Sequence, residues 1–425
     1  MRRVVILGGG FGGLYAARDL KGAPVQVTVI DRTNHHLFQP MLYQVATAAL
    51  SPGDIAYPIR SVLRRNRNTD VLMGEVERVD TRHRVVILAD GRSIDYDYLL
   101  VTLGARHSYF GHDDWEHLAP GLKTIGDGLE VRRRILMSFE LAEQERDPAT
   151  RQAYLNFVIV GAGPTGVEVA GALAEIKEKT LKRDFRNINP REARVILVEA
   201  GSQVLPAYPA KLSKAAQKTL ERLGVIVHTG ALVTDVRADG VAIGNDFIPS
   251  HCVIWAAGNK ASPVLGTLGV PLDRQGRVIV EPDLSIPGHP EVFVLGDCAA
   301  FSHQAGYSGP LPAVSPVAIQ MGHYAARIIR NETARNSLTS ARPPFHYHDK
   351  GQLAVIGRGR AVADLTHLDF SGFFAWLTWI FVHIAYLIGF RNRVIVLTEW
   401  AISYFTYGRG ARLINSARSA GDDGS

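Results

Sequence analysis

Short apolar runs recur along the chain, and several end at a glycine or an acidic residue. The first run, Val4–Leu7, leads into the glycine-rich stretch Gly8–Gly13, and small and apolar residues then follow at helical spacing from Leu14 to Leu20. A second run, Val25–Ile30, ends on Asp31. Continuous apolar runs of this length are typical of parallel strands that are buried on both faces. The pattern predicts strand, glycine loop, helix and strand.

The same order of segments returns in the middle of the chain. The corresponding segments are Phe157–Val160, Gly161–Gly166, an apolar helix from Val167 to about Lys182, and a strand from Arg194 that ends on Glu199. A later strand in each copy also matches, Leu99–Ala105 in the first and Val253–Gly258 in the second. This duplication predicts an α/β fold with two Rossmann-like dinucleotide-binding domains.

Other apolar segments predict further elements. We expect paired strands over Val71–Asp80 and Arg84–Leu88, a strand within Glu291–Ala300, a helix that opens near Leu311 and runs to about Arg330, and a turn between short strands at Asp349–Gly351.

Each glycine loop has the spacing of a dinucleotide fingerprint. The first glycine (Gly8 or Gly161) allows a tight turn, the second (Gly10 or Gly163) lets a pyrophosphate approach the backbone, and the third (Gly13 or Gly166) permits close packing of helix and strand. Asp31 and Glu199 are placed to accept hydrogen bonds from ribose hydroxyls. Glu199 would repel a 2′-phosphate, which favours NADH over NADPH. Two bound nucleotides are therefore predicted.

Composition excludes several other kinds of chemistry. The formal net charge is +6, and no basic run is interleaved with aromatic residues, so nucleic-acid binding is not expected. Cys252 and Cys298 are the only cysteines and lie far apart in the sequence, so neither a CxxC pair nor a zinc site is predicted. His35 and His36 carry no metal-ligand spacing, and we expect surface or packing roles for them.

The C-terminal part of the chain changes character. Ser371–Phe390 has fifteen hydrophobic residues of twenty and no Asp, Glu, Lys or Arg. Tryptophans in and after this segment, with Arg391, Arg393, Arg409 and Arg412, suit residence at a lipid interface. We expect peripheral docking on a bilayer, while a membrane span and a buried core or dimer helix remain alternatives.

With these residues in hand, the chain resembles the type II NADH dehydrogenases, which are FAD flavoproteins that reduce quinone without pumping protons. The resemblance covers almost the whole chain. It rests on His36–Thr47 (HLFQPMLYQVAT), Gly161–Gly171 (GAGPTGVEVAG), Asp349–Arg358 (DKGQLAVIGR) and Ala385–Leu413.

The resemblance implies a role for each matching residue. FAD would be bound by Gly8, Gly10, Phe11, Gly12, Gly13, Asp31, Arg32, Gln44, Thr47, Gly104, Asp297 and Lys350. NADH would be bound by Gly161, Gly163, Thr165, Gly166, Glu199, Ala257 and Gly258. Three residues would act in the reaction: Glu168 between nicotinamide, flavin and quinone, Lys350 beside the reduced flavin ring, and Gln320 at the quinone.

The resemblance also implies an arrangement of domains and a location. The FAD domain would span residues 1–115 and 280–365, the NADH domain 116–279, and a segment for membrane docking or dimerisation 366–425. The protein would be a homodimer, attached peripherally to the cytoplasmic face of the cell membrane.

One position departs from the family pattern. Pro316 stands where the quinone helix usually has its first glutamine, whereas Gln320 matches the second. A soluble acceptor therefore stays open as an alternative to a membrane quinone. Two further alternatives are a reductase resembling sulfide:quinone reductase, for which the two cysteines supply no redox pair, and a non-catalytic NADH-binding redox sensor.

Overall fold

The computed structural model of the chain describes residues 1–335, 342–365, 368–406 and 408–414. Close packing divides the chain into two compact units. The first comprises Met1–Leu37, Ala56–Arg106 and Asn259–Lys350, and the second comprises Phe38–Ile55, His107–Gly258 and the chain from Gly351 onward. These units are defined by packing, whereas the predicted domains are defined by cofactors, so the predicted domain boundaries stay a prediction.

The first unit is built on a six-stranded sheet, whose strands run in the order β20-β21-β9-β1-β2-β5. The strands are β1 (Arg2–Leu7), β2 (Val25–Asp31), β5 (Thr69–Met73), β9 (Tyr98–Val101), β20 (Ser285–Ile286) and β21 (His289–Val294). All neighbours are parallel except β20 and β21. Residues Val4–Leu7 are buried without interruption, as a parallel strand covered on both faces requires.

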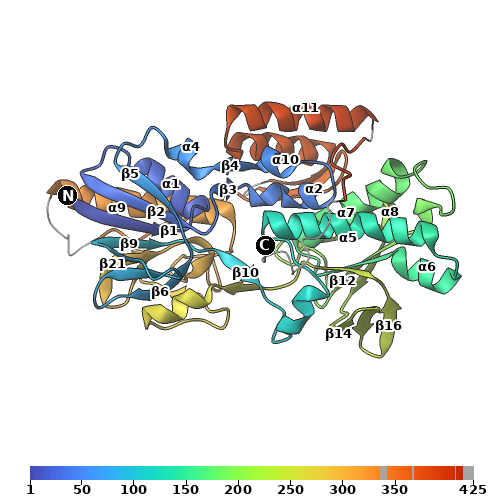
Figure 1. Cartoon of the computed structure of the whole chain (residues 1–425), viewed down its shortest axis with the longest axis horizontal. Coiled ribbons are helices and arrows are strands. Elements are labelled where there is room, and N and C mark those ends of the chain that lie inside the picture. The colour runs from blue at the N-terminus through green and yellow to red at the C-terminus, as the bar shows by residue number, and fades with distance from the viewer. Residues whose placement is uncertain (336–341, 366–367, 407, 415–425) are drawn as a thin grey trace, which may run out of the picture. The chain divides into compact units, whose positions relative to one another are not determined.

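Helix α1 (Phe11–Asp19) packs along α9 (Ser315–Arg335) beside this sheet (Figure 1). The two helices approach closely because glycines face each other: a Cβ on Gly322 would lie 2.4 Å from the carbonyl oxygen of Gly12. The smaller elements of this unit are β3 (His35–Leu37) with β4 (Ala56–Pro58), α4 (Ile59–Leu63), and an antiparallel sheet of β6 (Val76–Asp80), β7 (Val85–Leu88) and β8 (Ser93–Asp95). The remaining short elements are β18 (Asn259–Ala261), η5 (Pro263–Leu268), β19 (Val278–Ile279), η6 (Gly296–Cys298) and β22 (Ala299–Ala300).

The second unit is built on a parallel four-stranded sheet in the order β13-β12-β11-β17. The strands are β11 (Asn156–Val160), β12 (Arg194–Glu199), β13 (Val225–Thr229) and β17 (Cys252–Trp255), and the long helices are α5 (Ile125–Gln144), α7 (Pro164–Glu175) and α8 (Ala210–Arg222). A second sheet joins β14 (Val233–Arg237), β15 (Gly240–Ile243) and β16 (Asp246–Pro249). Shorter elements are η1 (Gln39–Met41), α2 (Leu42–Ala46), α3 (Pro52–Ile55), η2 (Asp113–His117), α6 (Pro148–Tyr154), η3 (Ile176–Thr180) and η4 (Pro190–Glu192). Strand β10 (Ala105–His107) begins in the first unit and ends at His107 in the second.

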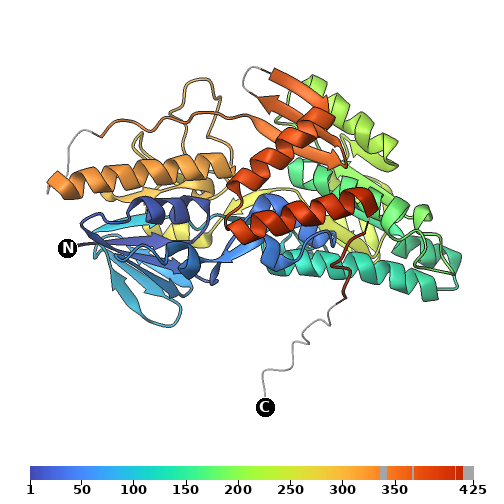
Figure 2. The same ribbon diagram turned by 90° about the horizontal axis from the view of Figure 1, so that it is seen from above.

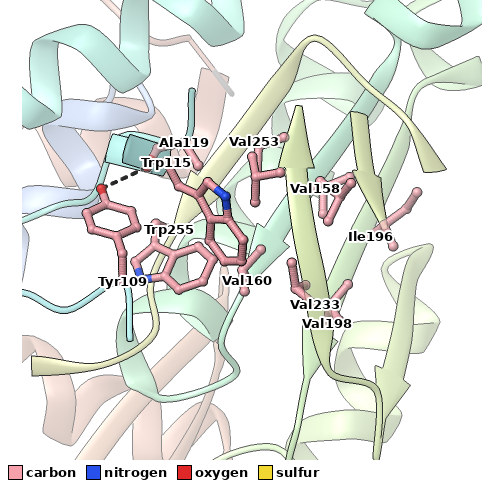
Figure 3. Packing of buried hydrophobic residues seen from close by; sticks show 12 residues of the cluster. Tyr109, Trp115, Ala119, Val158, Val160, Ile196, Val198, Val233, Val253 and Trp255 are labelled. Atoms are coloured by element: carbon pink, nitrogen blue, oxygen red, sulfur yellow. Dashed lines mark hydrogen bonds between the residues drawn. The ribbon is translucent and has the colours of Figure 1, made fainter. Parts of the chain in front are cut away.

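Aromatic residues extend the core of the second unit beyond its parallel sheet. Tyr109, Trp115 and Trp255 pack against valines that include Val160 and Val198 (Figure 3). Tyr109 and Trp255 both have hydrogen-bond partners: the Tyr109 hydroxyl donates to the Ala119 carbonyl at 2.9 Å and the indole of Trp255 donates to the Ser108 carbonyl at 2.9 Å. Buried aromatic groups with such partners contribute packing without an unpaired polar group.

The C-terminal part of the second unit is a sheet followed by two helices. The sheet joins β23 (Gln352–Gly357), β24 (Arg360–Leu365) and β25 (Leu368–Gly372), and the helices are α10 (Phe373–Tyr386) and α11 (Phe390–Thr406). Figure 2 shows α10 and α11 as successive helices, in red, joined by a sharp bend. Gly389 lies in this bend with φ +93°. The apolar segment 371–390 is therefore divided among a strand, a helix and a bend. Among the described residues, no helix combines the length and the apolar character that a bilayer span requires.

Two predicted elements differ from the structure. Val71–Asp80 is not one strand: β5 joins the six-stranded sheet, and only β6 pairs with β7. Gly74, between the two strands, allows the change of sheet because its backbone lies close to Leu88. Asp349–Gly351 is not a turn between short strands, because 342–350 contains no strand and β23 begins at Gln352 to pair with β24.

Candidate active site

The first glycine loop adopts a conformation that only glycine accommodates at two of its positions. Gly8 has φ +101°, and its N–H donates to the carbonyl of Ile30 at 2.7 Å. A Cβ on Gly13 would lie 2.0 Å from the carbonyl oxygen of Gly8. In contrast, a Cβ on Gly10 would meet no atom within 4 Å. The space at Gly10 is therefore open, as the approach of a pyrophosphate to the backbone would require.

Asp31 organises this loop from the end of β2. Its Oδ2 accepts a hydrogen bond from the N–H of Gly9 at 2.6 Å, and its Oδ1 accepts from the N–H and the hydroxyl of Thr33, both at 2.7 Å. The next residue, Arg32, is exposed, and Phe11 and Gly12 begin α1. Oδ2 of Asp31 keeps a lone pair that a further donor can use, whereas Oδ1 already accepts two hydrogen bonds. These bonds fix the loop and leave one acceptor site on the carboxylate.

Gly104 and Asp297 lie where β9 and β21 end. Gly104 has φ +69°, and its carbonyl accepts a weak hydrogen bond from Sγ of Cys298 at 3.4 Å. Asp297 is half-buried in the short helical turn that follows β21. Burial raises the pKa of the Cys298 thiol to about 12 and that of Cys252 to about 12. Both cysteines are free and buried, so neither is a ready thiolate.

Gln320 and Lys350 are linked through the segment that precedes β23. The amide of Gln320 donates to the carbonyl of His348 at 2.9 Å and accepts from the N–H of the same residue at 2.9 Å. Lys350 is exposed two residues later. Gln320 therefore fixes the backbone that leads to Lys350, and its predicted contact with a quinone stays a prediction.

The second glycine loop repeats the first in detail. Gly161 has φ +98°, and its N–H donates to the carbonyl of Val198 at 2.8 Å. A Cβ on Gly166 would lie 1.9 Å from the carbonyl oxygen of Gly161. Glu199 accepts from the N–H of Ala162 at 2.7 Å and from that of Gly201 at 2.8 Å. The predicted duplication is thus a duplication of hydrogen bonds as well as of sequence.

The remaining residues predicted for NADH surround this loop. Gly163 precedes the first turn of α7, Thr165 lies half-buried in that turn, and a Cβ on Gly163 would meet no atom within 4 Å. Ala257 and Gly258 follow β17, and a Cβ on Gly161 would lie 2.8 Å from the nitrogen of Ala257. The structure thus brings these residues together at one end of the four-stranded sheet.

Glu168 lies one turn further along α7, and only 9% of it is exposed. Burial raises the pKa of Glu168 well above its usual range, and a hydrogen bond from the backbone of Val355 acts in the opposite direction. Burial therefore favours the neutral, protonated form of this carboxyl group over the carboxylate. A buried acid of this kind is a candidate proton donor.

Glu168 opens into a cavity of about 110 Å³, formed within the second unit. A single water molecule needs about 15 Å³ of cavity volume. The cavity is therefore several times larger than one water requires. Apolar and aromatic side chains dominate its wall. The lining residues are Tyr43, Gln44, Thr47, Ala49, Glu168, Ala172, Glu175, Val355, Ile356, Gly357, Arg358, Trp376, Trp379, Ile380, Trp400, Ser403, Tyr404 and Arg409.

Gln44 and Thr47, which the resemblance assigns to FAD, both line this cavity. The amide of Gln44 donates to the hydroxyl of Tyr43 at 3.0 Å and accepts from the indole of Trp400 at 2.7 Å. Burial raises the pKa of Tyr43 well above its usual range. The contact of Gln44 and Thr47 with FAD stays a prediction. In the structure both residues form part of the cavity wall.

Arg409 corrects one interpretation of the tail. The sequence suggests an arginine at the lipid interface, whereas Arg409 is only 9% exposed. Its guanidinium donates to the carbonyls of Thr47 at 2.6 Å and Ala172 at 3.3 Å, and pairs with Glu175 at 3.4 Å. Sequence analysis missed Tyr43, Trp379, Trp400 and Arg409 as cavity residues. The clustering of tryptophans in the tail was the available signal, but it also fits a lipid interface.

The fold and the two loops define an oxidoreductase with two dinucleotide sites. Two family profiles match the chain: pyridine nucleotide-disulphide oxidoreductase over residues 2–322, and the NDH2 C-terminal domain over residues 349–410. The chain belongs to the type II NADH:quinone oxidoreductases, within the pyridine nucleotide-disulphide oxidoreductase family. The predicted resemblance and fold class are confirmed.

Individual relatives span nearly the whole chain. It is 48% identical over 427 residues to the type II NADH:quinone oxidoreductase NdhA of Mycobacterium tuberculosis, covering 97% of this chain and 89% of that one. It is 46% identical over 429 residues to the enzyme Ndh of the same organism, covering 98% and 91%. The solved structure of NDH2 from Plasmodium falciparum in complex with NADH has a TM-score of 0.85 at 19% identity, covering 98% of this chain and all of that one. This last similarity shows the fold alone.

Proposed function

We propose that this chain oxidises NADH through bound FAD and reduces a quinone with the two electrons, without pumping protons. The observation that carries the proposal is the pair of equivalent glycine loops, one in each unit, together with the buried acid Glu168 at the cavity. A chain with two nucleotide sites can hold a permanent cofactor on one and exchange a substrate on the other.

The first loop is the proposed site of FAD. Its residues fit the group, because Gly10 leaves open space beside the N-terminus of α1 and Asp31 presents carboxylate oxygens next to it. Bound FAD would supply the redox chemistry, accepting a hydride and passing two electrons onward. Arg32, Gly104, Asp297 and Lys350 are proposed to line the rest of the cofactor. The protein contributes alignment and charge rather than a nucleophile, in agreement with the raised pKa of both cysteines.

The second loop is the proposed site of NADH. Glu199 holds the N–H groups of Ala162 and Gly201 and lies where the adenosine ribose would be, with Gly163, Thr165, Ala257 and Gly258 around the rest of the nucleotide. A carboxylate there accepts from a free 2′-hydroxyl and repels a 2′-phosphate. NADH is therefore the proposed donor in preference to NADPH.

The cavity beside Glu168 is the proposed site of the quinone ring. Its aromatic wall, which includes Trp379, Trp400 and Tyr404, suits a flat apolar ring, and Tyr43 and Gln44 place polar groups at the same cavity. Hydride transfer from NADH delivers two electrons and one proton, so forming a quinol requires one further proton. The neutral carboxyl of Glu168 is proposed to donate it and to be reprotonated from water.

Rapid mixing with excess NADH tests the first half of this function, because flavin absorbance should bleach before any quinone is added. Quinone added afterwards should restore the absorbance. A soluble acceptor such as ferricyanide, used in place of quinone, separates the two kinds of acceptor. A flavin that NADH does not bleach would exclude this function, and slow reoxidation by every quinone tested would favour the redox sensor.

Peripheral attachment to the cytoplasmic face of the cell membrane is proposed from the apolar surface of α10 and α11. Phe374, Phe381, Phe390 and Phe405 are each more than 70% exposed, and Arg391 beside them is exposed as well. Exposed aromatic groups next to a cation suit an anionic lipid surface. The homodimer stays a prediction from the resemblance.

Vesicle flotation tests the attachment. Replacing Phe374, Phe381 and Phe405 together with serine should lower binding to vesicles of anionic lipid by at least about tenfold, because each buried aromatic contributes on the order of 2 kcal/mol. Leu232→Ser, at a residue 64% exposed outside α10 and α11, is the matched control. Unchanged vesicle binding combined with a shift from dimer to monomer would assign this surface to a second copy of the chain.

A further inference from the structure

A buried histidine completes the first glycine loop. His36, in β3, is 2% exposed, and its Nδ1 lies 2.9 Å from the carbonyl oxygen of Gly9. The ring of Phe11 packs edge-on against it, with centroids 4.9 Å apart and an interplanar angle of 90°. The imidazole is therefore fixed between the loop and the first residue of α1.

The contact with Gly9 determines the tautomer of this histidine. A carbonyl oxygen only accepts, so Nδ1 carries the hydrogen and Nε2 presents a lone pair. Burial lowers the pKa of His36 to about 4, against the raising effects of the Gly9 carbonyl and of Asp31, so the ring is neutral at physiological pH. Nε2 is buried and has no hydrogen-bond partner among the residues that the structure describes.

An acceptor in this situation requires an explanation. Leaving a buried polar atom without a partner costs about 1–3 kcal/mol. The second loop avoids the problem altogether, because the carbonyl of Ala162, which corresponds to that of Gly9, accepts from the backbone N–H of Leu205 at 2.7 Å. The first loop instead uses a side chain with a second nitrogen.

We propose that Nε2 of His36 accepts a hydrogen bond from the adenosine half of FAD, either from a ribose hydroxyl or from the adenine amino group. This inference rests on the proposed placement of FAD on the first loop. The adenosine half is indicated because Asp31 and His36 hold the same residue, Gly9, one through its N–H at 2.6 Å and the other through its carbonyl at 2.9 Å. A ligand whose ribose reaches Asp31 therefore lies beside the imidazole.

Two substitutions distinguish the contributions of the two ring nitrogens of His36. In His36→Asn the amide occupies the place of Nδ1, so the bond to Gly9 can be kept while the outer acceptor is lost. In His36→Gln the longer side chain carries its amide to the place of Nε2 and gives up the bond to Gly9. The readout is the composition of bound flavin after the holoenzyme is equilibrated with a mixture of FAD and FMN, since FMN lacks the adenosine half.

The proposal predicts that His36→Asn lowers the preference for FAD over FMN by about tenfold, the worth of one hydrogen bond. His36→Gln should keep this preference within about threefold while lowering the melting temperature. His36→Met, which offers no comparable acceptor, provides the test if the asparagine variant does not fold, and it should lose the preference as His36→Asn does. An unchanged preference in His36→Asn, or in His36→Met if that variant is used, would overturn the proposal, and so would an equal loss of FAD and FMN.

Asp31→Asn distinguishes this failure from failure of the proposed FAD site. If Asp31→Asn lowers FAD retention and His36→Asn does not alter flavin preference, only the assignment of His36 is wrong. If neither substitution changes flavin binding, FAD does not lie on the first loop, and both proposals fall together.

Discussion

The two glycine loops have nearly the same backbone, but they differ in what covers the residue after the first glycine. In both, that residue donates its N–H to the acid that ends the second strand, at 2.6 Å to Asp31 and 2.7 Å to Glu199. Its carbonyl bonds to the side chain of His36 in the first loop and to the backbone of Leu205 in the second. The imidazole adds a second nitrogen, which we propose binds FAD, whereas the backbone N–H of Leu205 adds no such group. The difference lies in the loop that we propose for the retained cofactor, and the loop proposed for the exchanging substrate lacks it.

The largest effect is expected from adding a methyl group at the third glycine of either loop. Gly13→Ala and Gly166→Ala place a Cβ about 2 Å from a backbone oxygen, so each should destabilise its unit by about 3 kcal/mol or more. Gly10→Ala and Gly163→Ala meet no atom and should leave urea unfolding unchanged. The first of these two should lose FAD and the second should raise KM for NADH. The loops would not be equivalent if only one of the crowded substitutions destabilised the protein.

The next effect distinguishes the two half-reactions. Glu168 has no acidic counterpart in the first copy, where the corresponding residue of α1 is Tyr15. Glu168→Gln keeps the shape of the side chain and removes the exchangeable proton. Quinone reduction should slow by about a hundredfold, while flavin bleaching by NADH stays within about twofold. Stopped-flow traces of the two steps give both rates. Equal slowing of the two steps would place Glu168 in NADH binding instead.

The raised pKa of Glu168 also predicts a pH dependence of stability. The folded chain binds this proton more tightly than the unfolded chain, so stability is full below the unfolded pKa, near 4.3, and falls as pH rises toward the folded value. Glu168→Gln removes this loss. Its free energy of unfolding relative to the unsubstituted chain should therefore increase between pH 5 and pH 8. A difference independent of pH over that range would mean that the carboxyl group is already ionised.

A smaller effect is expected at Asp31 and Glu199, the acidic residues that end β2 and β12. Glu199→Gln should raise kcat/KM for NADPH relative to NADH by about tenfold, since repulsion of the 2′-phosphate is lost. Asp31→Asn should leave this ratio unchanged and act only on FAD retention. Initial rates with each nucleotide measure the ratio. A shift caused by Asp31→Asn would reverse the assignment of the two loops.

The smallest effect is expected at the cysteines, one in each unit. Cys252→Ala and Cys298→Ala remove thiols that are buried and protonated, so each should cost about 1 kcal/mol of stability and leave the rate of flavin reoxidation unchanged. Loss of reoxidation in either variant would bring back a mechanism like that of sulfide:quinone reductase.

Much of this comparison could be predicted from the sequence, because it depends on local geometry. Positive φ at Gly8 and Gly161, and the carboxylates of Asp31 and Glu199 at strand ends, follow from spacing within one strand-loop-helix unit. The cavity could not be predicted in this way, because it joins α2, α7, β23, α10 and α11 from distant parts of the chain. The same reason explains the error over Arg409: in the sequence it is one arginine among several, and only folding places it on the carbonyls of Thr47 and Ala172.

The burial of Arg409 has a consequence for protein engineering. Ending the chain before α10 is an obvious way to obtain an enzyme that is easier to purify, because this removes the exposed aromatic groups of α10 and α11. It also removes Arg409. Such a chain would lose the cation that pairs with Glu175 and the guanidinium bonds to the carbonyls of Thr47 and Ala172 at the cavity. Inhibitor screens on shortened protein would therefore sample an altered cavity. Substituting exposed phenylalanines while keeping residues up to 414 preserves the cavity that a drug would meet.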